Sequence, residues 1–379
     1  MVREVDVLIA GGGPVGAVLA ASLESSGLDV ALVDPGDPAA GRLRPIALSH
    51  GSRLVLEGVG AFAGLDATPI ETIHVSQTGA FGRTVMRREE LGIPALGYVV
   101  DLSALAAHLA PFASRVRKRG RVVRWEGGAE RATATVATAD GDATWSARLV
   151  ILADGGGSAG AGLAQKDYGQ AAIAATVRTE EAPRGVAWER FTPHGPLALL
   201  PFADGYALVW TVAASQAERM LVMDDRAFLG ALADTFGGRL GPFLAAGPRT
   251  SYPLVLRFQR EPVAAPRVVL AGNAAQTLHP VAGQGLNLGL RDAAELAVVV
   301  RATPRDEIGA PAFAARVAAR RAADRYATIG LTDSLVRVFS NSNPALAIAR
   351  GLGLVALDLA PPARRFFARR MIFGARALP

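Results

Sequence analysis

The stretch VDVLIAGGGPVG (residues 5–16) decides the fold, because it joins an apolar run directly to glycines at fixed spacing. Its first half predicts a buried β-strand, and the small residues that follow Gly16 predict a helix packed closely against that strand. A second apolar strand, at residues 30–33, ends on Asp34. A strand, a G-x-G-x-x-G turn, a helix and an acid about 20 residues further on are typical of a dinucleotide-binding unit.

Each residue of this pattern has a physical role in such a unit. Gly11 makes the tight turn, Gly13 lets a pyrophosphate approach the backbone, and Gly16 allows the helix to lie close to the strand. Asp34 is expected to accept hydrogen bonds from ribose hydroxyls. The alternative is a glycine-rich turn that holds no ligand.

Composition bounds the class of protein. The chain has 379 residues, of which 50% are hydrophobic and 20% charged, so we expect a globular protein of two domains or one large α/β unit. It contains no cysteine, which excludes disulfides, zinc–thiolate sites and a cysteine nucleophile. The N-terminus leads straight into a strand, and no run of about 18 uncharged apolar residues follows. We therefore expect a cytoplasmic protein without a signal peptide or a spanning helix.

The basic residues suggest one surface contact. The net charge of +6 is modest, and no basic stripe is interleaved with aromatic residues, so nucleic-acid binding is a poor hypothesis. The C-terminus differs, because five arginines lie there among apolar side chains: Arg364, Arg365, Arg369, Arg370 and Arg376. Such a tail can lie on an anionic membrane surface, which would place the protein on the inner face of the cytoplasmic membrane. The alternative is a surface helix packed on its own domain or on a partner.

Two further strand ends carry candidate ligand groups. Residues 149–153 predict a buried strand that ends at Asp154 and Gly155, which places a carboxylate at the carboxyl edge of a parallel sheet. The stretch RVVLAGNAAQTLHPVAGQGLNLGLRD (residues 267–292) predicts a strand, a Pro/Gly-rich turn and a helix. The start of that helix offers unpaired N–H donors to an anion or a polarised carbonyl.

The middle of the chain is β-rich. Residues 168–259 predict an antiparallel sheet with one helical insert at 224–236, and residues 311–340 and 344–359 predict helices. Five aromatic residues of the sheet are candidates for an apolar pocket, the alternative being simple core packing: Trp188, Phe191, Phe202, Trp210 and Tyr252.

The predicted fold class is therefore α/β. A Rossmann-like dinucleotide domain (1–72, 101–165 and 260–305) is interleaved with an antiparallel-sheet substrate domain (73–100 and 166–259). A C-terminal helical region (306–379) ends in the basic amphipathic tail.

Arg44 and four of the five histidines lie outside the strand-end segments described above. Arg44 follows a Gly/Pro-rich loop and either reaches a phosphate or flavin or is a solvated surface residue. His50, His74, His108 and His194 do not have the spacing of metal ligands, so we predict no metal site.

Three motifs in this order resemble those of the single-component flavoprotein aromatic hydroxylases, which share the fold of p-hydroxybenzoate hydroxylase. They are GGGPVG with Asp34, the segment ADG at 153–155, and GNAAQTLHPVAGQGLNLG at 272–289. Together with WERFTPHGPLALLP (188–201) and RYATIGLTDSLVRVFSN (325–341), they are most similar to the ubiquinone-biosynthesis branch, in particular the 2-polyprenyl-6-methoxyphenol hydroxylases. The resemblance covers nearly the whole chain.

This resemblance implies FAD as the cofactor, with Gly11, Gly13, Gly16 and Asp34 at its ADP end. It implies further FAD contacts, namely those of Arg44, Asp154, Gly155, Asn273 and Pro280 and the backbone donors of Gly283, Gln284, Gly285, Leu286 and Asn287. Pro280 would lie beside the flavin ring, and His279 is a candidate for acid/base work or for a structural role. Ser103 departs from the family, because many relatives carry an arginine near that position on the adenine side.

The reaction implied is hydroxylation of a prenylated phenol. NADPH or NADH would act as a transient co-substrate that reduces FAD, and O2 would then form a flavin C4a-hydroperoxide that hydroxylates the ring. Other readings remain open: a hydroxylase of another ring position or another phenol, a flavoprotein reductase without oxygen insertion, or an FAD-bound scaffold subunit. Other ubiquinone-biosynthesis proteins are expected as partners in the last case. The W-x-W-x-I-P motif of related halogenases is absent.

Overall fold

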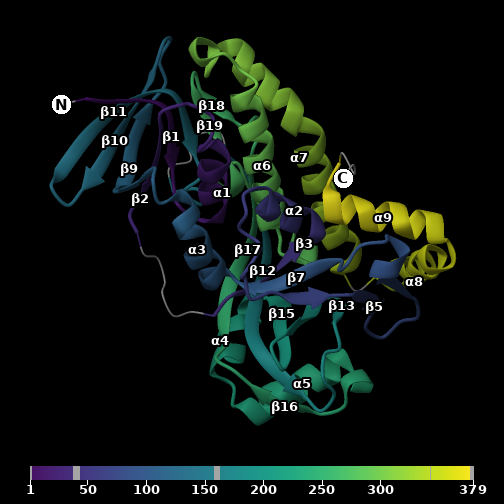
Figure 1. Cartoon of the computed structure of the whole chain (residues 1–379). Coiled ribbons are helices and arrows are strands. Elements are labelled where there is room, and N and C mark those ends of the chain that lie inside the picture. The colour runs from purple at the N-terminus through teal and green to yellow at the C-terminus, as the bar shows by residue number, and fades with distance from the viewer. Residues whose placement is uncertain (1, 37–42, 158–162, 342, 376–379) are drawn as a thin grey trace.

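An eight-stranded sheet forms the first layer of the molecule (Figure 1). The computed structural model describes residues 2–36, 43–157, 163–341 and 343–375. The main strand order is β18-β19-β11-β1-β2-β8, and β10 and β9 extend antiparallel from β11. The strands are β1 (Arg3–Ala10), β2 (Val30–Asp34), β8 (Arg117–Arg119), β9 (Arg121–Glu126), β10 (Ala132–Thr138), β11 (Gly141–Leu152), β18 (Val263–Ala265) and β19 (Val268–Leu270).

The parallel strands of this sheet bring the three sequence motifs to one edge. Strand β1 is parallel to both β2 and β11, and β11 is parallel to β19. Their carboxyl ends are therefore side by side, and the chain leaves them at Gly11, Asp34, Asp154 and Gly272. Open α/β sheets bind ligands at this edge.

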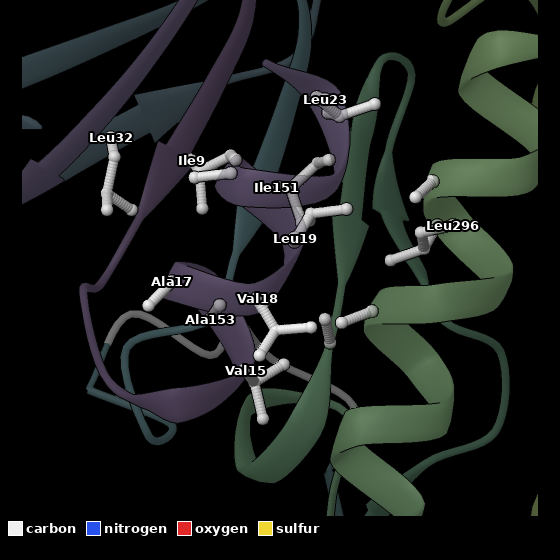
Figure 2. Close-up of a cluster of buried hydrophobic side chains, with 14 of the residues drawn as sticks. Ile9, Val15, Ala17, Val18, Leu19, Leu23, Leu32, Ile151, Ala153 and Leu296 are labelled. Atoms are coloured by element: carbon white, nitrogen blue, oxygen red, sulfur yellow. The ribbon is translucent and has the colours of Figure 1, made fainter. Parts of the chain in front are cut away.

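Helices α1 (Pro14–Leu23) and α6 (Gln284–Arg301) pack against the sheet and against each other. Figure 2 shows Leu19 and Leu23 of α1 together with Ile9 of β1, Ile151 of β11 and Leu296 of α6. All five side chains are at most 2% exposed. Each such side chain contributes about 2 kcal/mol through burial of apolar surface. The core therefore fixes α1 and α6, and with them both helix starts, relative to the strand ends.

A nine-stranded sheet forms the second layer, in the order β20-β17-β12-β15-β14-β13-β5-β6, with β16 paired to β12. Its strands are antiparallel neighbours except for β13 and β5. The strands are β5 (Thr72–Gln77), β6 (Arg83–Arg87), β12 (Leu163–Thr179), β13 (Val186–Thr192), β14 (Gly195–Phe202), β15 (Gly205–Ala213), β16 (Phe243–Ala246), β17 (Thr250–Gln259) and β20 (Gln276–Thr277). Helices α4 (Ala214–Val222) and α5 (Asp225–Phe236) cover one face of this sheet with apolar side chains.

A small three-stranded sheet and the remaining helices complete the described part of the chain (Figure 1). The sheet has the order β3 (Pro45–Ser49), β7 (Gly97–Asp101), β4 (Thr68–Ile70). The helices are α2 (His50–Gly58), α3 (Leu102–Leu109), α7 (Pro311–Phe339), α8 (Pro344–Leu359) and α9 (Pro361–Phe373). Among the described residues, no single helix is long and apolar enough to cross a membrane; α8 and α9 meet that criterion only as a pair, bent by 101°.

The predicted fold class is confirmed, while several element bounds are wrong. The strand expected at 149–153 is the end of a single 12-residue strand, β11, whose first residues pair antiparallel with β10. Strand β12 starts at Leu163, before the expected β-rich segment, because it pairs with β17 as far as Gln259. Helix α4 was missed beside the expected insert at 224–236. Every strand of the first sheet lies within the segments assigned to the dinucleotide domain, and the division into domains remains a prediction.

Candidate active site

A single cavity of about 1140 Å³ connects the strand edge of the first sheet with one face of the second. This volume exceeds what one drug-sized ligand usually occupies, so the cavity has room for a large cofactor and a second molecule. Most of the residues that we expected to hold the cofactor line it: Gly11, Gly13, Asp34, Arg44, Asp154, Gly155, Asn273, Pro280, Gly283, Gln284, Gly285, Leu286 and Asn287. Gly16 and His279 are not in the lining.

The glycines of the turn after β1 have two different roles: some are required by packing, and one leaves open space. Gly11 has a φ of +104°, and a Cβ there would lie 2.6 Å from the carbonyl oxygen of Ala153. A Cβ on Gly16 would lie 1.9 Å from the carbonyl oxygen of Gly11, so this position is required for packing of α1 on β1. Gly13 has no heavy atom within 4 Å of its would-be Cβ. The open space at Gly13 is where a ligand can approach the backbone.

Asp34 stands at the carboxyl end of β2 and is 8% exposed. Its Oδ2 accepts a hydrogen bond from Nη2 of Arg117, the first residue of the neighbouring strand β8. A Cβ on Gly12 would lie 2.5 Å from the same Oδ2, so the carboxylate borders the glycine turn directly. The sequence did not indicate the Arg117 contact, because it depends on the pairing of β2 with β8.

The second and third motifs meet each other. Asp154 Oδ1 accepts a hydrogen bond from the N–H of Gly156 at 3.1 Å, which closes the turn after β11. A Cβ on Gly156 would lie 3.3 Å from the carbonyl oxygen of Asn273. Asn273 itself is exposed in the cavity lining. The two turns therefore form one continuous wall.

Arg44 lies at the rim of the cavity. Its side chain is exposed, and the guanidinium carbon stands 4.8 Å from the ring centroid of Tyr252. Its backbone N–H donates to Oδ2 of Asp101 at 2.6 Å, which fixes the chain at this point. The guanidinium thus lines the cavity with a stacking partner, and within the described residues no hydrogen bond or ion pair engages it.

The side chain of Asn287 clamps α6 to β3. Its Nδ2 donates to the carbonyl oxygens of Ala47 (2.9 Å) and Gly283 (2.7 Å). Its Oδ1 accepts from the N–H of Ser49 (2.7 Å) and the hydroxyl of Ser52 (2.6 Å). The side chain is 2% exposed and uses its hydrogen-bonding groups within the protein. Only the backbone of Asn287 is therefore left to face a cofactor.

A buried polar network supports the loop between β19 and α6. Asp292 accepts hydrogen bonds from the N–H of Gly272 (3.0 Å), from Nε2 of Gln276 (2.6 Å) and from Nε of Arg321 on α7 (2.6 Å). Arg325, the next turn of α7, donates from Nε to Oε1 of Gln276 at 2.7 Å. Burial lowers the pKa of the Arg321 guanidinium, but the carboxylates around it outweigh this and raise it above its usual value. Sequence inspection missed this network because its members come from separate elements.

His279 is fully buried behind the cavity wall. Its Nδ1 accepts a hydrogen bond from the N–H of Val281 at 3.2 Å, and its ring meets that of Tyr168 edge-on at 5.4 Å. Burial lowers the pKa of His279 to about 4, so the ring is neutral at pH 7. The geometry favours the structural role over acid/base work, because a catalytic group must reach the reacting atoms. Pro280, in contrast, lines the cavity.

The second half of the cavity is apolar. Its floor is the face of the second sheet that α4 and α5 do not cover, and its walls come from α7, α8 and α9. Trp188 and Phe191 line it as predicted, and Phe191 stacks on Phe339 of α7 at 3.9 Å. The prediction is wrong for three aromatic residues that lie outside the lining: Phe202, Trp210 and Tyr252.

The alternation of side chains along a strand explains the error at Trp210. Its neighbour Val209 lines the cavity, so Trp210 points to the opposite face, where it packs 6.0 Å from Phe228 of α5. Phe202 is the last residue of β14. Tyr252, a residue of β17, lies beneath the guanidinium of Arg44.

The basic tail is a docked helix. Helix α9 buries Ala368 and Ile372 against the body of the protein, and Arg364 pairs with Glu90 at 2.9 Å. Arg376 lies outside the described residues. The opposite side of the helix remains open, since Phe366 is 71% exposed.

The starts of two helices border the cavity, and their N–H groups show whether the site suits FAD. Helix α1 begins after Gly13 and α6 after Gly283, and neither start has a side-chain cap or an acidic residue in its first turn. Their N–H groups are left for a ligand with a negative or polarised group at each place. FAD has two such groups, the pyrophosphate and the N1–C2=O edge of the flavin. The residues present therefore fit FAD.

Comparison with known proteins agrees with this fit. A family model described as an FAD binding domain matches residues 4–307, which is most of the chain. The chain therefore belongs to this family of FAD-binding proteins, and FAD is its cofactor.

Curated relatives narrow the branch. The chain is 37% identical to the ubiquinone hydroxylase UbiL of Rhodospirillum rubrum, over 96% of this chain and 88% of that protein. It is 32% identical to the 3-demethoxyubiquinol 3-hydroxylase of Escherichia coli, over 95% of this chain and 96% of that protein. The resemblance to the FAD-dependent ubiquinone-biosynthesis hydroxylases is thus confirmed.

Solved structures share the fold. The p-nitrophenol 4-monooxygenase PnpA of Pseudomonas putida DLL-E4 superposes with a TM-score of 0.78 at 17% identity, covering 98% of this chain and 99% of that one. The rebeccamycin biosynthetic enzyme RebC, solved with reduced flavin, gives a TM-score of 0.71 at 20% identity, covering 99% of this chain and 78% of that one.

Proposed function

We propose that the protein is an FAD-dependent monooxygenase that uses NAD(P)H and O2 to hydroxylate the aromatic ring of a prenylated phenol, a precursor of ubiquinone. The observation that carries the proposal is that one cavity joins two uncapped helix starts to an apolar half. We call this half, between the second sheet and α7, α8 and α9, the chamber. The names of the relatives support the substrate class.

The chemistry that bound FAD would supply is acceptance of a hydride from the nicotinamide cofactor and activation of oxygen. The start of α6, with its uncapped N–H groups after Gly283, would hold the edge of the flavin on which negative charge develops. Asn287 holds this helix start against β3, so its donors do not have to reorganise during the reaction. The start of α1, after Gly13, would hold the pyrophosphate.

The chamber beside the flavin has to exclude water, because water diverts activated oxygen into hydrogen peroxide. Its lining supplies this property through apolar side chains from three parts of the chain. Phe191 and Leu200 come from the second sheet, Phe339 from α7, and Leu354 and Met371 from α8 and α9.

The test is product formation by the FAD-loaded protein. We expect NADPH or NADH oxidation in the presence of a prenylated phenol to consume O2 and to yield a product heavier by one oxygen atom, detected by mass spectrometry. Flavin reduction with hydrogen peroxide as the only oxygen product would refute the proposal and favour a reductase. FAD binding without reduction would favour a scaffold subunit in an assembly of ubiquinone-biosynthesis proteins. Substrates that differ in their substituents identify the ring position.

We also propose a peripheral membrane contact through α8 and α9, which places the protein at the inner face of the cytoplasmic membrane. Four apolar side chains support it, because they are exposed on the outer side of the helices that wall the chamber: Ile348 (56%), Leu352 (58%), Leu359 (77%) and Phe366 (71%). Arg365 is also exposed there, and arginine side chains attract anionic lipid.

Sedimentation with vesicles that contain anionic lipid tests this contact. The double variant Leu359→Asn, Phe366→Asn should lose binding while FAD content is kept, because both side chains are exposed. An unchanged partition between vesicle and supernatant would remove the membrane contact.

A further inference from the structure

One carboxyl group interrupts the apolar floor of the chamber. Glu189 lies on β13 and lines the cavity together with Ala187 and Phe191, which point to the same side of the strand. Its direct neighbours on the adjacent strands are Val75 of β5 and Ala198 of β14, both apolar. Within the described residues no hydrogen bond or ion pair engages Glu189, although it lies deep in the molecule and is only partly exposed, toward the cavity.

Glu189 faces the loop that holds the flavin. Phe191, two residues further along β13, packs in one hydrophobic cluster with Val281, which directly follows Pro280. Ala187, two residues back, packs in another cluster with Ala47, whose carbonyl oxygen is held by Asn287. Residues of one face repeat about every 6.6 Å along a strand. Glu189 therefore stands between a contact with the loop before α6 and a contact with β3, to which Asn287 ties the start of α6.

A second polar group of the floor also lacks a partner. Thr84 of β6 is opposite Val75, which is itself opposite Glu189, so the three residues form one row across the sheet. Thr84 lines the cavity and is 1% exposed, and its hydroxyl oxygen has no hydrogen-bond partner. Buried hydroxyls without a partner are rare, since each costs about 1–3 kcal/mol. A ligand that supplies the missing hydrogen bond accounts for it.

We propose that Glu189 and Thr84 form the polar subsite that binds the oxygen substituents of the aromatic substrate, with Glu189 accepting the hydrogen bond of the phenolic hydroxyl. The inference rests on the proposed function and names the part of the cavity that orients the ring. One strand, β5, lies between β13 and β6, so the two backbones stand about 10 Å apart, which is two inter-strand spacings. This spacing suits one aromatic ring with oxygen substituents on two sides.

The chemistry suits an electron-rich ring. Burial raises the pKa of Glu189 to about 7, so the group exchanges its proton near neutral pH. An ionised Glu189 accepts the phenolic O–H and draws its proton away from the oxygen, which increases the electron density of the ring that is to be hydroxylated. Among the described residues of the lining, Glu189 is the only acid on the second sheet, and the other two acids, Asp34 and Asp154, stand at the strand edge of the first sheet.

The experiment compares two ligands on the FAD-loaded protein. The probes are a phenol with one isoprene unit on the ring and its O-methyl ether, which lacks the donor hydrogen. Binding is followed through the change in flavin absorbance. Wild-type protein should bind the phenol at least 10-fold more tightly than the ether at pH 8, where Glu189 is ionised, because a hydrogen bond to a charged group contributes that much.

Glu189→Leu should remove this preference and leave the ether affinity unchanged. Thr84→Val, which keeps the shape of the side chain, should weaken both ligands by a smaller factor, because its hydroxyl serves another oxygen. Asp204→Asn, an exposed residue of the turn between β14 and β15, is the matched control and should keep the wild-type preference. Leucine suits the apolar floor, so Glu189→Leu should keep its FAD and its melting temperature.

The outcomes separate this inference from the proposed function. A wild-type preference for the phenol that survives Glu189→Leu overturns the subsite and leaves the hydroxylase proposal standing. Wild-type protein that binds neither probe and oxidises no NAD(P)H in response to phenols overturns both. A preference lost with Glu189→Leu and kept with Asp204→Asn supports both.

Discussion

The buried network around Asp292 allows a test of how the loop between β19 and α6 is held in place. Asp292→Asn keeps the size of the side chain and removes its charge. The asparagine has one acceptor oxygen where the carboxylate has two, and its NH2 group must then face a donor of Gly272, Gln276 or Arg321. One buried donor is therefore left unpaired, and the buried charge of Arg321 loses its main partner.

These two effects set the expected loss in the free energy of unfolding of Asp292→Asn. An unpaired buried donor costs about 1–3 kcal/mol, and breaking a buried ion pair from one side costs about 3–5 kcal/mol. Arg321 keeps a second carboxylate, since its Nη1 lies 3.3 Å from Oδ2 of Asp324. We therefore expect the lower end, a loss of about 3 kcal/mol in the free energy of unfolding. The affinity for FAD should fall about 10-fold as well, because Gly272 is no longer fixed.

Urea unfolding with excess FAD measures the first quantity, and fluorescence titration of the FAD-free protein measures the second. The matched control is Glu295→Gln, which breaks the partly exposed pair of Glu295 with Arg320 between the same two helices. That variant should lose no more than about 1 kcal/mol, as exposed ion pairs do. A loss below 1 kcal/mol for Asp292→Asn, equal to that of the control, would refute the reasoning.

Further predictions concern the glycine turn, the clamp and the buried histidines. Gly16→Ala places a Cβ 1.9 Å from a backbone oxygen and should abolish stable FAD binding, whereas Gly13→Ala enters open space and should keep the melting temperature while FAD content falls. Asn287→Asp puts a carboxylate against two carbonyl oxygens and should lower the free energy of unfolding by about 2–4 kcal/mol, measured in urea; an unchanged midpoint would contradict the clamp. His74 and His279 have pKa values lowered by burial to about 4, so the unfolded chain binds more protons below pH 6.5. Stability should therefore fall as the pH drops from about 6.5 to about 4, by up to about 3 kcal/mol for each histidine, and His279→Gln should flatten the profile of unfolding midpoint against pH.

The fold class was predictable because its signals are local. The glycines from Gly11 to Gly16 and the acid Asp34 need one strand, one turn and one helix, and short-range patterns report those elements directly. Parallel pairing of β1, β2, β11 and β19 then places the three motifs at one edge of the sheet. Bounds failed where pairing decides them, as for β12, whose first residues form a strand only because β17 lies beside them.

The substrate side of the site was harder to predict. Phe191 and Trp210 are both aromatic residues in apolar strands, and only the alternation of the assembled sheet assigns the first to the cavity and the second to the core under α5. Glu189 gave no signal at all, because an acid in a strand is usually exposed. Its significance depends on the apolar neighbours that two other strands, β5 and β14, bring beside it.

The two arginines of α7 have a consequence for where this enzyme can be divided. The family model ends at residue 307, yet Arg321 and Arg325 come from beyond it and satisfy Asp292 and Gln276 inside the flavin-binding body. A chain shortened at that boundary would keep every FAD motif and still carry a buried carboxylate with no counter-charge. The C-terminal helices are thus not an exchangeable module. In a chimera of two relatives, the segment up to residue 307 and the helices after it should therefore come from the same parent. A chimera that mixes parents at this boundary should fail to fold around its cofactor.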